Sequence, residues 1–401
     1  MSAERLCYLD NNATTRIAPE VFAAMEPFLR EQWGNPSSAY RFGRAAHDAL
    51  EQARGAVAAL IGAEAREVVF TSCGTEATNA ALHSALATQP GKRHVVTTRV
   101  EHSATLKHCQ KLEQQGVEVT WLPVEPDGTL DLGELQAALR DDTAIVSVML
   151  ANNETGVLFP VDDIAAVCRA HGVLCHTDAV QTPGKIPLDV RALGVDFASF
   201  SAHKLYAPKG IGALYVRRGT RFEPLLVGGS QEAGRRGGTE NVPYIVGFGR
   251  AAALAAEGHL AAYQGVGKLR DRLESEILQN VPGASLNGHR TERLPNTTNI
   301  AFDGVEAEGL LLMLDQAGIC ASGGSACTTG QVTPSHVLTA MGLSAARAKG
   351  SVRFSLGIYN TGADVDYALE HLPRIVRRLR DLSPAAEPAR RPVPAPATIV
   401  A

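Results

Sequence analysis

The sequence predicts an α/β fold in which helices cover a mainly parallel sheet, with a smaller second domain after it. From residue 67 onward, short β-rich runs alternate with helix-like stretches such as 75–86 and 161–170, and this alternation is typical of α/β domains. Several runs are almost wholly apolar rather than alternating, as expected when helices cover both faces of a parallel sheet. The predicted strands are residues 67–71, 94–98, 117–122, 144–150, 172–176 and 197–201.

A long helix-like stretch, roughly residues 245–278, is expected to lead from this sheet to the second domain. We therefore assign residues 15–260 to a large domain. Residues 261–382, together with 1–14, are assigned to a small α/β C-terminal domain. The tail 383–401 is rich in Pro and Ala and is predicted to be disordered, with a docking peptide as the alternative.

The small domain is expected to end in a helix. This helix should begin near residues 361–364, where the pattern Thr-x-x-Asp resembles a capping box. Pro373 lies inside it and is expected to kink or break it, because proline lacks the backbone N–H that a helix needs.

The composition excludes several classes of protein. Of the 401 residues, 45% are hydrophobic, so a chain that is disordered along its whole length is excluded. The 38 Lys+Arg against 42 Asp+Glu give a formal charge of −4, and nucleic-acid binding, which needs clustered basic charge, is not expected. We find no signal-peptide pattern and no apolar run of the ~18 residues that span a bilayer. The seven cysteines form a poor disulfide framework, so we expect a soluble cytoplasmic protein with reduced thiols.

Three segments that follow predicted strands together indicate a binding site. Residues 71–76 form a turn of small residues that opens a helix, where free N–H groups and the positive helix end accept a phosphate. Asp178 lies just after the predicted strand 172–176, and its carboxylate can keep a pyridine nitrogen protonated. Lys204, in Ser-Ala-His-Lys, lies just past a buried strand, where α/β sheets bind ligands. Taken alone, each is more often an ordinary turn, a helix cap or a surface lysine.

In this order, a phosphate-binding turn, a pyridine partner and a Schiff-base lysine resemble the fold-type-I pyridoxal-phosphate enzymes, in their class-V aminotransferase branch. The resemblance extends over about residues 7–380 and is narrowed to the cysteine desulfurases by six further motifs. These begin at Leu9 (Leu-Asp-Asn-Asn-Ala-Thr-Thr), Gly34 (Gly-Asn-Pro-Ser-Ser), Glu101 (Glu-His), Asn152 (Asn-Asn-Glu-Thr-Gly), Arg236 (Arg-Gly-Gly-Thr-Glu-Asn) and Gly324 (Gly-Ser-Ala-Cys).

The nitrogen-fixation (NifS-type) members are the most similar, because Thr-Thr-Gly follows the last motif and Pro-Ser-His-Val-Leu stands at 334–338. Residues 229–233, Gly-Ser-Gln-Glu-Ala, depart modestly from the usual Gly-Gly-Gln-Glu-Arg, which puts local dimer contacts in doubt. The resemblance implies a seven-stranded sheet, pyridoxal 5′-phosphate as the cofactor, L-cysteine as the substrate and a homodimer. It also implies an iron–sulfur scaffold protein as the sulfur acceptor, with nitrogenase metalloclusters as the suggested destination.

The resemblance assigns a role around the cofactor ring to five residues. Lys204 binds the cofactor and then moves the α-proton of the substrate. Asp178 pairs with the ring nitrogen, and Gln181 contacts the ring hydroxyl. His102 stacks on the ring and is a candidate for shuttling protons, while Asn153 lies beside the ring hydroxyl and the substrate.

The resemblance also assigns the groups that bind the phosphate and the substrate. Arg353 is expected to bind the substrate carboxylate, for which a planar two-pronged guanidinium is better suited than lysine. The neighbouring subunit is expected to contribute Thr239 to the phosphate site. The remaining phosphate ligands are Gly74, Thr75, Ser201 and His203.

Cys327 determines the reaction that the resemblance implies. It lies in a glycine-flanked segment that is expected to be able to swing. Its thiolate attacks the sulfur of the bound cysteine, which gives alanine and a persulfide on Cys327. An ordinary thiol of pKa ~8.5 is only a few per cent thiolate at pH 7, so a neighbouring base or positive charge should help, and His102 is the candidate. The persulfide is also a candidate for transient contact with a metal, iron, during cluster assembly.

Two cysteine-containing signals are discounted. Cys168, His171, Cys175 and His176 look like a metal cluster, but Cys175 and His176 are neighbours on a predicted strand and point to opposite faces. Cys73 is expected to be a small buried residue, with a second reactive thiol as the alternative.

Two other functions remain open from the sequence. A related pyridoxal enzyme, either a selenocysteine lyase or a small-amino-acid aminotransferase, is one; an aminotransferase would have no use for Cys327. The other is a non-catalytic scaffold for sulfur delivery, against which an intact Lys204 argues.

Overall fold

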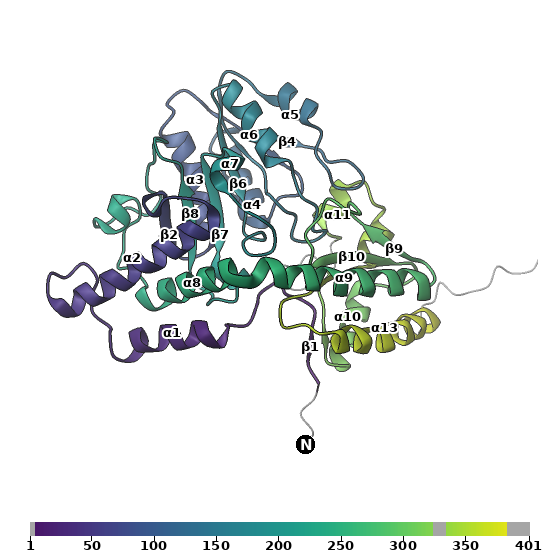
Figure 1. Ribbon diagram of the computed structural model, residues 1–401. Coiled ribbons are helices and arrows are strands. Elements are labelled where there is room, and N and C mark those ends of the chain that lie inside the picture. Colours follow the sequence, from purple (N-terminus) through teal and green to yellow (C-terminus); the bar gives the residue numbers. More distant parts are fainter. Residues whose placement is uncertain (1–4, 324–333, 383–401) are drawn as a thin grey trace, which may run out of the picture.

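Seven strands form the central sheet of the computed structural model, which describes residues 5–323 and 334–382 (Figure 1). Their order is β2-β8-β7-β6-β5-β3-β4. The strands from β7 to β4 are parallel, whereas β8 is antiparallel to both of its neighbours. The mainly parallel seven-stranded sheet is therefore confirmed. Its strands are β2 (Val68–Thr71), β3 (His94–Thr98), β4 (Glu118–Leu122), β5 (Thr143–Ser147), β6 (Leu174–Asp178), β7 (Phe197–Ser201) and β8 (Gly212–Val216).

The six strands expected from the sequence correspond to β2 through β7. The largest difference is at β5, which was expected at 144–150 and ends at Ser147. The seventh strand, β8, was expected only from the resemblance. It lies between β2 and β7 and pairs with both, so it joins β2 to the parallel strands of the sheet.

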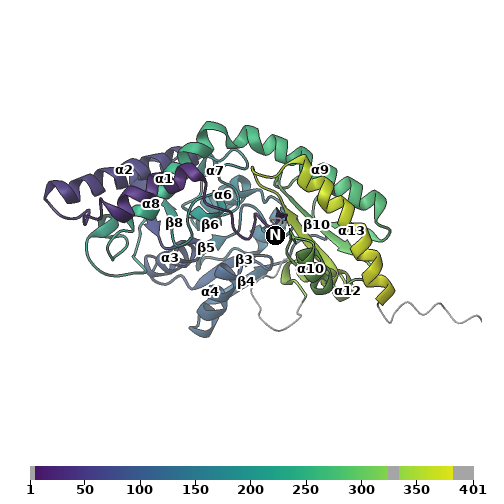
Figure 2. The same cartoon turned by 90° about the horizontal axis from the view of Figure 1, so that it is seen from below.

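Alternate side chains of the sheet enter two separate hydrophobic cores. On β3, Val95 lies in one core and Val96 in the other, and on β7 the same holds for Phe197 and Ala198. Helices α3 and α4 cover the first core, while α2, α6 and α8 cover the second (Figures 1 and 2). Because helices cover both faces, every residue of β2, β3, β5, β7 and β8 is buried.

The predicted helices at 75–86 and 161–170 correspond to α3 and α6. The helices around the sheet are α1 (Pro19–Arg30), α2 (Arg41–Ile61), α3 (Gly74–Ala87), α4 (Ser103–Gln114), α5 (Leu132–Ala138), α6 (Val161–Ala170), α7 (Val190–Leu193) and α8 (Val242–Leu254).

A smaller antiparallel sheet of order β12-β10-β9 forms the second part, with the pair β1–β11 beside it. Cys7 and Leu9 pack into its core together with residues between 263 and 376, so the N-terminal segment lies with the C-terminal part. The exact domain boundary at residue 260 stays a prediction. The elements are β1 (Cys7–Tyr8), β9 (Ala284–Asn287), β10 (Thr297–Phe302), β11 (Ile319–Cys320), β12 (Ser351–Ser355), α10 (Ala307–Gln316), α11 (His336–Ala340), α12 (Ala345–Lys349) and α13 (Gly362–Leu382).

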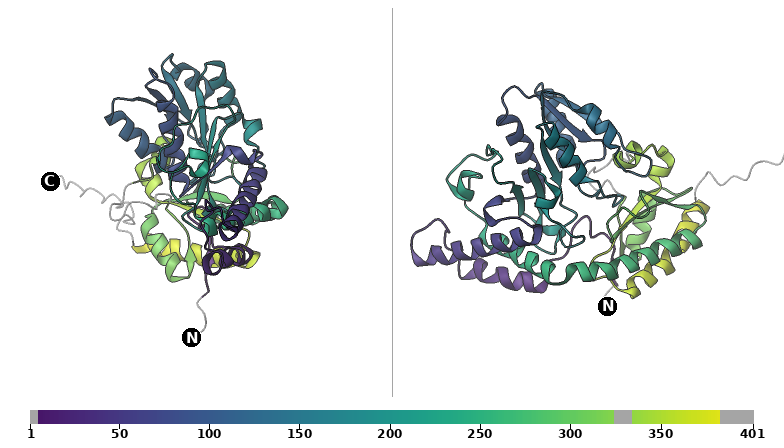
Figure 3. Two further views of the ribbon diagram at one scale, coloured as in Figure 1. Left: turned by 90° about the vertical axis from the view of Figure 1, so that its left-hand side faces the viewer. Right: turned by 45° about the horizontal axis from the view of Figure 1, so that its top comes forward.

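The two parts are joined by one continuous helical run (Figure 3). It consists of α8, a π-helical turn at Ala255–His259, and α9 (Leu260–Asn280). The long helix expected at 245–278 is thus present. In the small part, α9 lies side by side with α13 (Figure 2).

The C-terminal helix α13 begins as expected, because Asp364 accepts a hydrogen bond from the backbone N–H of Thr361 at 2.8 Å. A kink or a break was expected at Pro373. The break is wrong, because the helix continues to Leu382, and the kink stays a prediction. Proline removes one backbone hydrogen bond. Leu372 and Ile375, on either side of it, are buried in the small core and hold the helix in place.

A buried ion pair fixes the loop that leads to Thr239. Arg54 on α2 donates through Nη1 and Nη2 to the Glu232 carboxylate at 2.6 and 2.9 Å. Glu232 also accepts from the backbone N–H of Phe70 on β2 at 2.9 Å. Both Glu232 and Ala233 have positive φ, of 50° and 56°, so the ion pair supports a strained turn.

We predict that Glu232→Gln lowers the free energy of unfolding by about 3 kcal/mol, because it leaves the buried Arg54 guanidinium with only the exposed Glu51 carboxylate as a counter-charge. Urea denaturation measures the change. The control is Glu26→Gln, which removes an exposed pair with Arg30 and should cost less than about 0.5 kcal/mol. Equal costs for the two variants would contradict the prediction.

Candidate active site

A cavity of about 810 Å³ opens where β5, β6 and β7 end and where α3 and α4 begin. Parallel α/β sheets bind ligands at this edge. Within the described part of the chain, every predicted site residue except Thr239 lines it: Gly74, Thr75, His102, Asn153, Asp178, Gln181, Ser201, His203, Lys204 and Arg353.

Two predicted site residues are not in the cavity wall. Thr239 is exposed on the loop after Glu232 and does not line the cavity of its own chain. Cys327 lies outside the described residues. On one side of its segment, Ser322 and Arg353 exchange backbone hydrogen bonds of 3.1 and 2.6 Å, and on the other side Pro334 lines the cavity.

Lys204 enters the cavity from a short 3₁₀ turn, Ala202–Lys204, that directly follows β7. Its Nζ donates to the backbone carbonyls of Asn12 and Ala13, at 2.6 Å each. These two residues belong to the N-terminal segment that leaves the small sheet. The amine is therefore held at the junction of the two parts of the chain.

Asp178 is the last residue of β6 and is almost fully buried. Its Oδ1 accepts from the backbone N–H of Val180 at 3.0 Å. Burial raises the pKa of Asp178, and electrostatic interactions with His102 and Lys204 and the hydrogen bond from Val180 oppose this shift. No cationic side chain of the described chain lies within ion-pair distance of this carboxylate, so a protonated ring nitrogen would supply the missing partner.

His102 caps helix α4, and this fixes its tautomer. Its Nδ1 accepts from the backbone N–H of Ala104 at 3.2 Å. Burial lowers the pKa of His102, which Asp178 opposes and which Lys204 and His336 reinforce. The ring is therefore neutral, with its proton on Nε2.

The first turn of α3 forms a cradle for an anion. The side chain of its N-cap residue, Cys73, makes no capping hydrogen bond. A Cβ added to Gly74 would lie 2.8 Å from Cγ2 of Val180, and one added to Gly212 would lie 2.6 Å from the Cys73 carbonyl carbon. Both glycines let the helix start lie close to the sheet. Ser201 and His203 complete the cradle.

His203 is held by Thr14, whose Oγ1 lies 3.1 Å from its Nδ1. Burial, followed by the charge of Lys204, lowers the pKa of His203 to about 3. It is therefore a neutral hydrogen-bonding group in this part of the cavity.

Arg353 projects from β12 with its side chain only 3% exposed. Its Nη2 donates to Asp10 Oδ1 at 2.6 Å and its Nη1 to the carbonyl of Asn153 at 2.9 Å. Its Nε is buried and has no partner among the described residues. Such an unused donor suits an added anion such as a substrate carboxylate.

The cavity thus combines an amine, a buried carboxylate, an anion cradle and an arginine with a spare donor. These residues fit pyridoxal phosphate: the cradle fits its phosphate, Asp178 its ring nitrogen and Lys204 its aldehyde.

The sequence profile of one family, described as aminotransferase class-V, matches residues 7–368. The chain is 55% identical over 377 residues to cysteine desulfurase 2 of Trichormus variabilis, which covers 94% of each chain. It is 50% identical over 378 residues to cysteine desulfurase NifS of Azotobacter vinelandii, again with 94% of each covered. The solved structure of a NifS-like protein superposes with a TM-score of 0.88 at 40% identity, over 94% of this chain and 100% of the other.

The chain belongs to the class-V aminotransferase family. Its close relatives in that family are cysteine desulfurases, so the resemblance seen in the motifs is confirmed. The fold-type-I architecture and pyridoxal 5′-phosphate as the cofactor are confirmed with it. The roles of individual residues stay predictions.

Sequence reasoning missed several polar groups of this class-V site. Asn12 was part of a motif without a role, yet it contacts Lys204, Gln181 and Asn153. Lys185, which lies behind Gln181, carried no sequence signal, because nothing local distinguishes a buried lysine from a surface one.

The cysteines differ in part from expectation. Cys73 is half-buried and lines the cavity, so it is not simply a packing residue. Cys168 and Cys175 are both buried in the same core, and the neighbouring Cys168 thiol together with burial raises the pKa of Cys175. His176 does point to the other face, where it meets Ser147 and Ser199. Within the described ranges, no group of three or more His, Cys, Asp or Glu could hold a metal.

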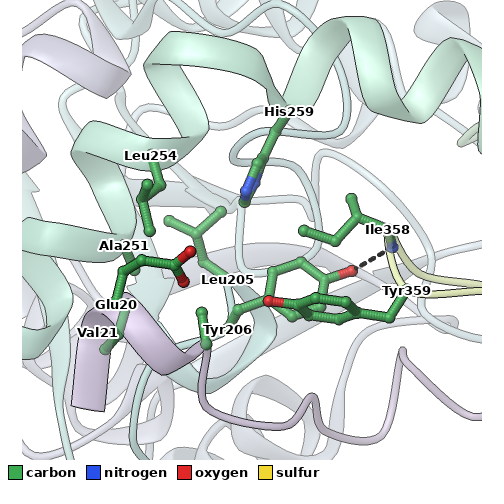
Figure 4. A pocket seen from close by; sticks show the side chains of 10 residues that line it. Glu20, Val21, Leu205, Tyr206, Ala251, Leu254, His259, Ile358 and Tyr359 are labelled. Atoms are coloured by element: carbon green, nitrogen blue, oxygen red, sulfur yellow. Dashed lines mark hydrogen bonds between the residues drawn. The ribbon is translucent and has the colours of Figure 1, made fainter. Parts of the chain in front are cut away.

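A smaller pocket of about 170 Å³ lies behind the Lys204 turn (Figure 4). Tyr206 forms part of its wall, beside His259. The Tyr206 hydroxyl accepts from the backbone N–H of Ile358 at 2.8 Å and lies 3.0 Å from the hydroxyl of Tyr263. Tyr206 thus joins the segment after Lys204 to the small part.

No helix in residues 5–323 and 334–382 is both long enough and apolar enough to cross a bilayer.

We predict that His176 makes the class-V fold acid-sensitive. Its pKa is lowered by burial to about 3, against ~6.5 when unfolded, so the unfolded state binds a proton that the folded state refuses. Stability is therefore lost as the pH falls from 6.5 toward 3, by about 2 kcal/mol at pH 5. His176→Gln should remove that part of the loss between pH 7 and 5, measured by urea denaturation.

The control is His171→Gln, at an exposed position, which should leave the pH dependence unchanged. An unchanged pH dependence in His176→Gln would show that its imidazole is protonated in the folded state.

Proposed function

We propose that this chain removes sulfur from L-cysteine, releases L-alanine and keeps the sulfur as a persulfide on Cys327. The observation that carries the proposal is the pairing of Ser322 with Arg353. It ties the start of the Cys327 segment to the strand that bears the predicted carboxylate ligand, at the rim of a cavity that contains Lys204.

When bound, pyridoxal phosphate supplies a ring that accepts the electrons of the substrate Cα–H bond. Lys204 Nζ takes that proton and returns one. The Asp178 carboxylate would stabilise a positive charge on the ring nitrogen. Because Asp178 is buried away from water, this electrostatic interaction would be stronger than at the surface. Arg353 orients the substrate through its carboxylate.

The sulfur step balances without an added oxidant. The Cys327 thiolate attacks Sγ of the substrate, so that an S–S bond forms while the Cβ–S bond breaks. The bonding pair goes to the carbon side, which is then protonated to the methyl group of alanine. Four residues separate Cys327 from Ser322, so the chain between them spans at most ~18 Å.

His102 acts in this scheme as a donor rather than as the base. Its Nδ1 is used by Ala104, so taking a proton from a thiol would break the helix cap. Its Nε2–H can instead hold an anionic group in the cavity, such as a thiolate. The sequence left open whether a base or a positive charge helps the thiol; the proposed role of a neutral donor is a third possibility.

We further propose a homodimer in which Thr239 reaches the phosphate of the neighbouring subunit. The exposed position of Thr239 and the exposed Leu226 and Val227 of the same loop support it. The acceptor is then an iron–sulfur scaffold protein, with nitrogenase metalloclusters as the destination, which the NifS-named relative supports. The free thiols of the described cysteines suit the cytoplasm.

We predict that Cys327→Ser retains cofactor absorbance near 420 nm but releases neither sulfide nor alanine from L-cysteine with a reductant. The wild type should release both in equal amounts. The matched control is Cys73→Ser, which alters the cavity thiol beside the anion cradle and should keep most of the activity. Full turnover by Cys327→Ser would remove that thiol from the mechanism, and loss of activity in Cys73→Ser instead would reassign it.

We predict that Arg353→Lys raises KM for L-cysteine by about 30-fold and changes kcat less. The single ammonium of lysine cannot donate to Asp10, Asn153 and the substrate carboxylate with the geometry of the guanidinium. Steady-state kinetics provide the measurement. Arg30→Lys, at an exposed position, is the control. A change in kcat alone would place Arg353 outside substrate binding.

A further inference from the structure

Lys185 is a buried lysine beside the cofactor pocket to which the proposed reaction gives no task. It lies in the loop after β6 and is only 3% exposed. Within the described part of the chain, no carboxylate lies within ion-pair distance of it. A lysine is rarely buried in this way without a counter-charge, so its contacts call for an explanation.

Both contacts of Lys185 are side-chain amide oxygens. Its Nζ donates to Gln181 Oε1 at 2.9 Å and to Asn12 Oδ1 at 3.2 Å. The backbone carbonyl of Asn12 in turn accepts from Gln181 Nε2 at 3.0 Å and from Lys204 Nζ at 2.6 Å. Lys185 and Lys204 are thus attached to the same residue.

The surroundings of Lys185 disfavour a positive charge on its amine. Burial lowers its pKa well below the usual range, and the positive charges of Lys204 and Arg353 add to this. A neutral amine still donates N–H groups, and it adds no further positive charge to a pocket that already contains two.

These contacts use both ends of the Gln181 amide. Its oxygen is taken by Lys185, and one of its N–H groups is taken by Asn12. The second N–H is then the donor that Gln181, a cavity-lining residue, can give to an acceptor in the pocket.

We propose that Lys185 is a positioning residue, whose buried amine holds the Gln181 amide so that it presents an N–H group to the cofactor. The inference rests on the proposed function, since it presumes that the cavity holds pyridoxal phosphate. Without Lys185, the buried Gln181 oxygen would have no donor, and the amide would turn to find one.

A double-mutant cycle on Lys185→Met and Gln181→Met tests the proposal. The readouts are the Kd for pyridoxal phosphate and the position of the absorbance band near 420 nm at fixed pH. Each single variant should weaken binding about tenfold, since roughly one hydrogen bond is lost. The double variant should bind no more than about twofold more weakly than Gln181→Met alone, because both changes remove the same contact.

Two further variants make the outcome decisive. Lys185→Gln keeps an uncharged donor and should bind the cofactor within about threefold of wild type, and it also serves if Lys185→Met does not fold. Lys268→Met, at an exposed lysine of α9, should match wild type.

The proposal is overturned if the two single effects multiply, if Lys185→Met binds like wild type, or if folded Lys185→Gln binds as weakly as Gln181→Met. A wild-type protein that binds no cofactor and shows no band near 420 nm would instead remove the proposed function.

Discussion

The site depends on Asn12, a single residue at which the two parts of the chain meet. Its carbonyl holds the Lys204 amine, and its side chain donates to Thr297 and accepts from Asn296 of the small part. Its backbone N–H donates to the Ser355 hydroxyl. The geometry of the reactive lysine is therefore set by the N-terminal segment and the small sheet as much as by β7.

This arrangement explains why so many polar groups are buried at the junction. Asn12, Lys185, Asn296 and Thr297 are all nearly inaccessible to solvent, and such groups are costly to bury unless they are hydrogen-bonded. Here each has a partner in the other part of the chain or in the N-terminal segment. Satisfying them requires one relative placement of the two parts, and that placement also brings Arg353 opposite Lys204 in one cavity.

Much of the fold could be predicted from the sequence because its signals are local. The short β-rich runs predicted β2 to β7, and the Thr-x-x-Asp start of α13 was correct because Thr361 and Asp364 interact with each other. Pro373 misled the prediction, since tertiary packing of Leu372 and Ile375 outweighs one lost backbone hydrogen bond. Local rules do not contain that packing.

The site was predictable where motif and strand end coincide, as for Lys204 and Asp178. The hydrogen bonds that hold the site residues in place were not predictable, because they join positions that are distant in the sequence. Examples are the contacts of Lys185 with Asn12 and of Arg353 with Asp10. The tautomer of His102 could not be foreseen either, since it depends on the ring turning back to cap its own helix. Motifs indicate which residues take part, while hydrogen-bond partners determine the protonation state in which they act.

The π-helical turn at Ala255–His259 has a consequence for how this protein tolerates changes in length. A turn of this kind holds one residue more than an α-helical turn while the helix axis continues. A chain shorter by one residue here could close the turn to ordinary α-helix and keep Phe248 on one core and Tyr263 on the other. The same deletion anywhere else in the run would rotate the following residues by about 100°. Natural variation in the length of the helical run from α8 to α9 should therefore concentrate at this π-helical turn.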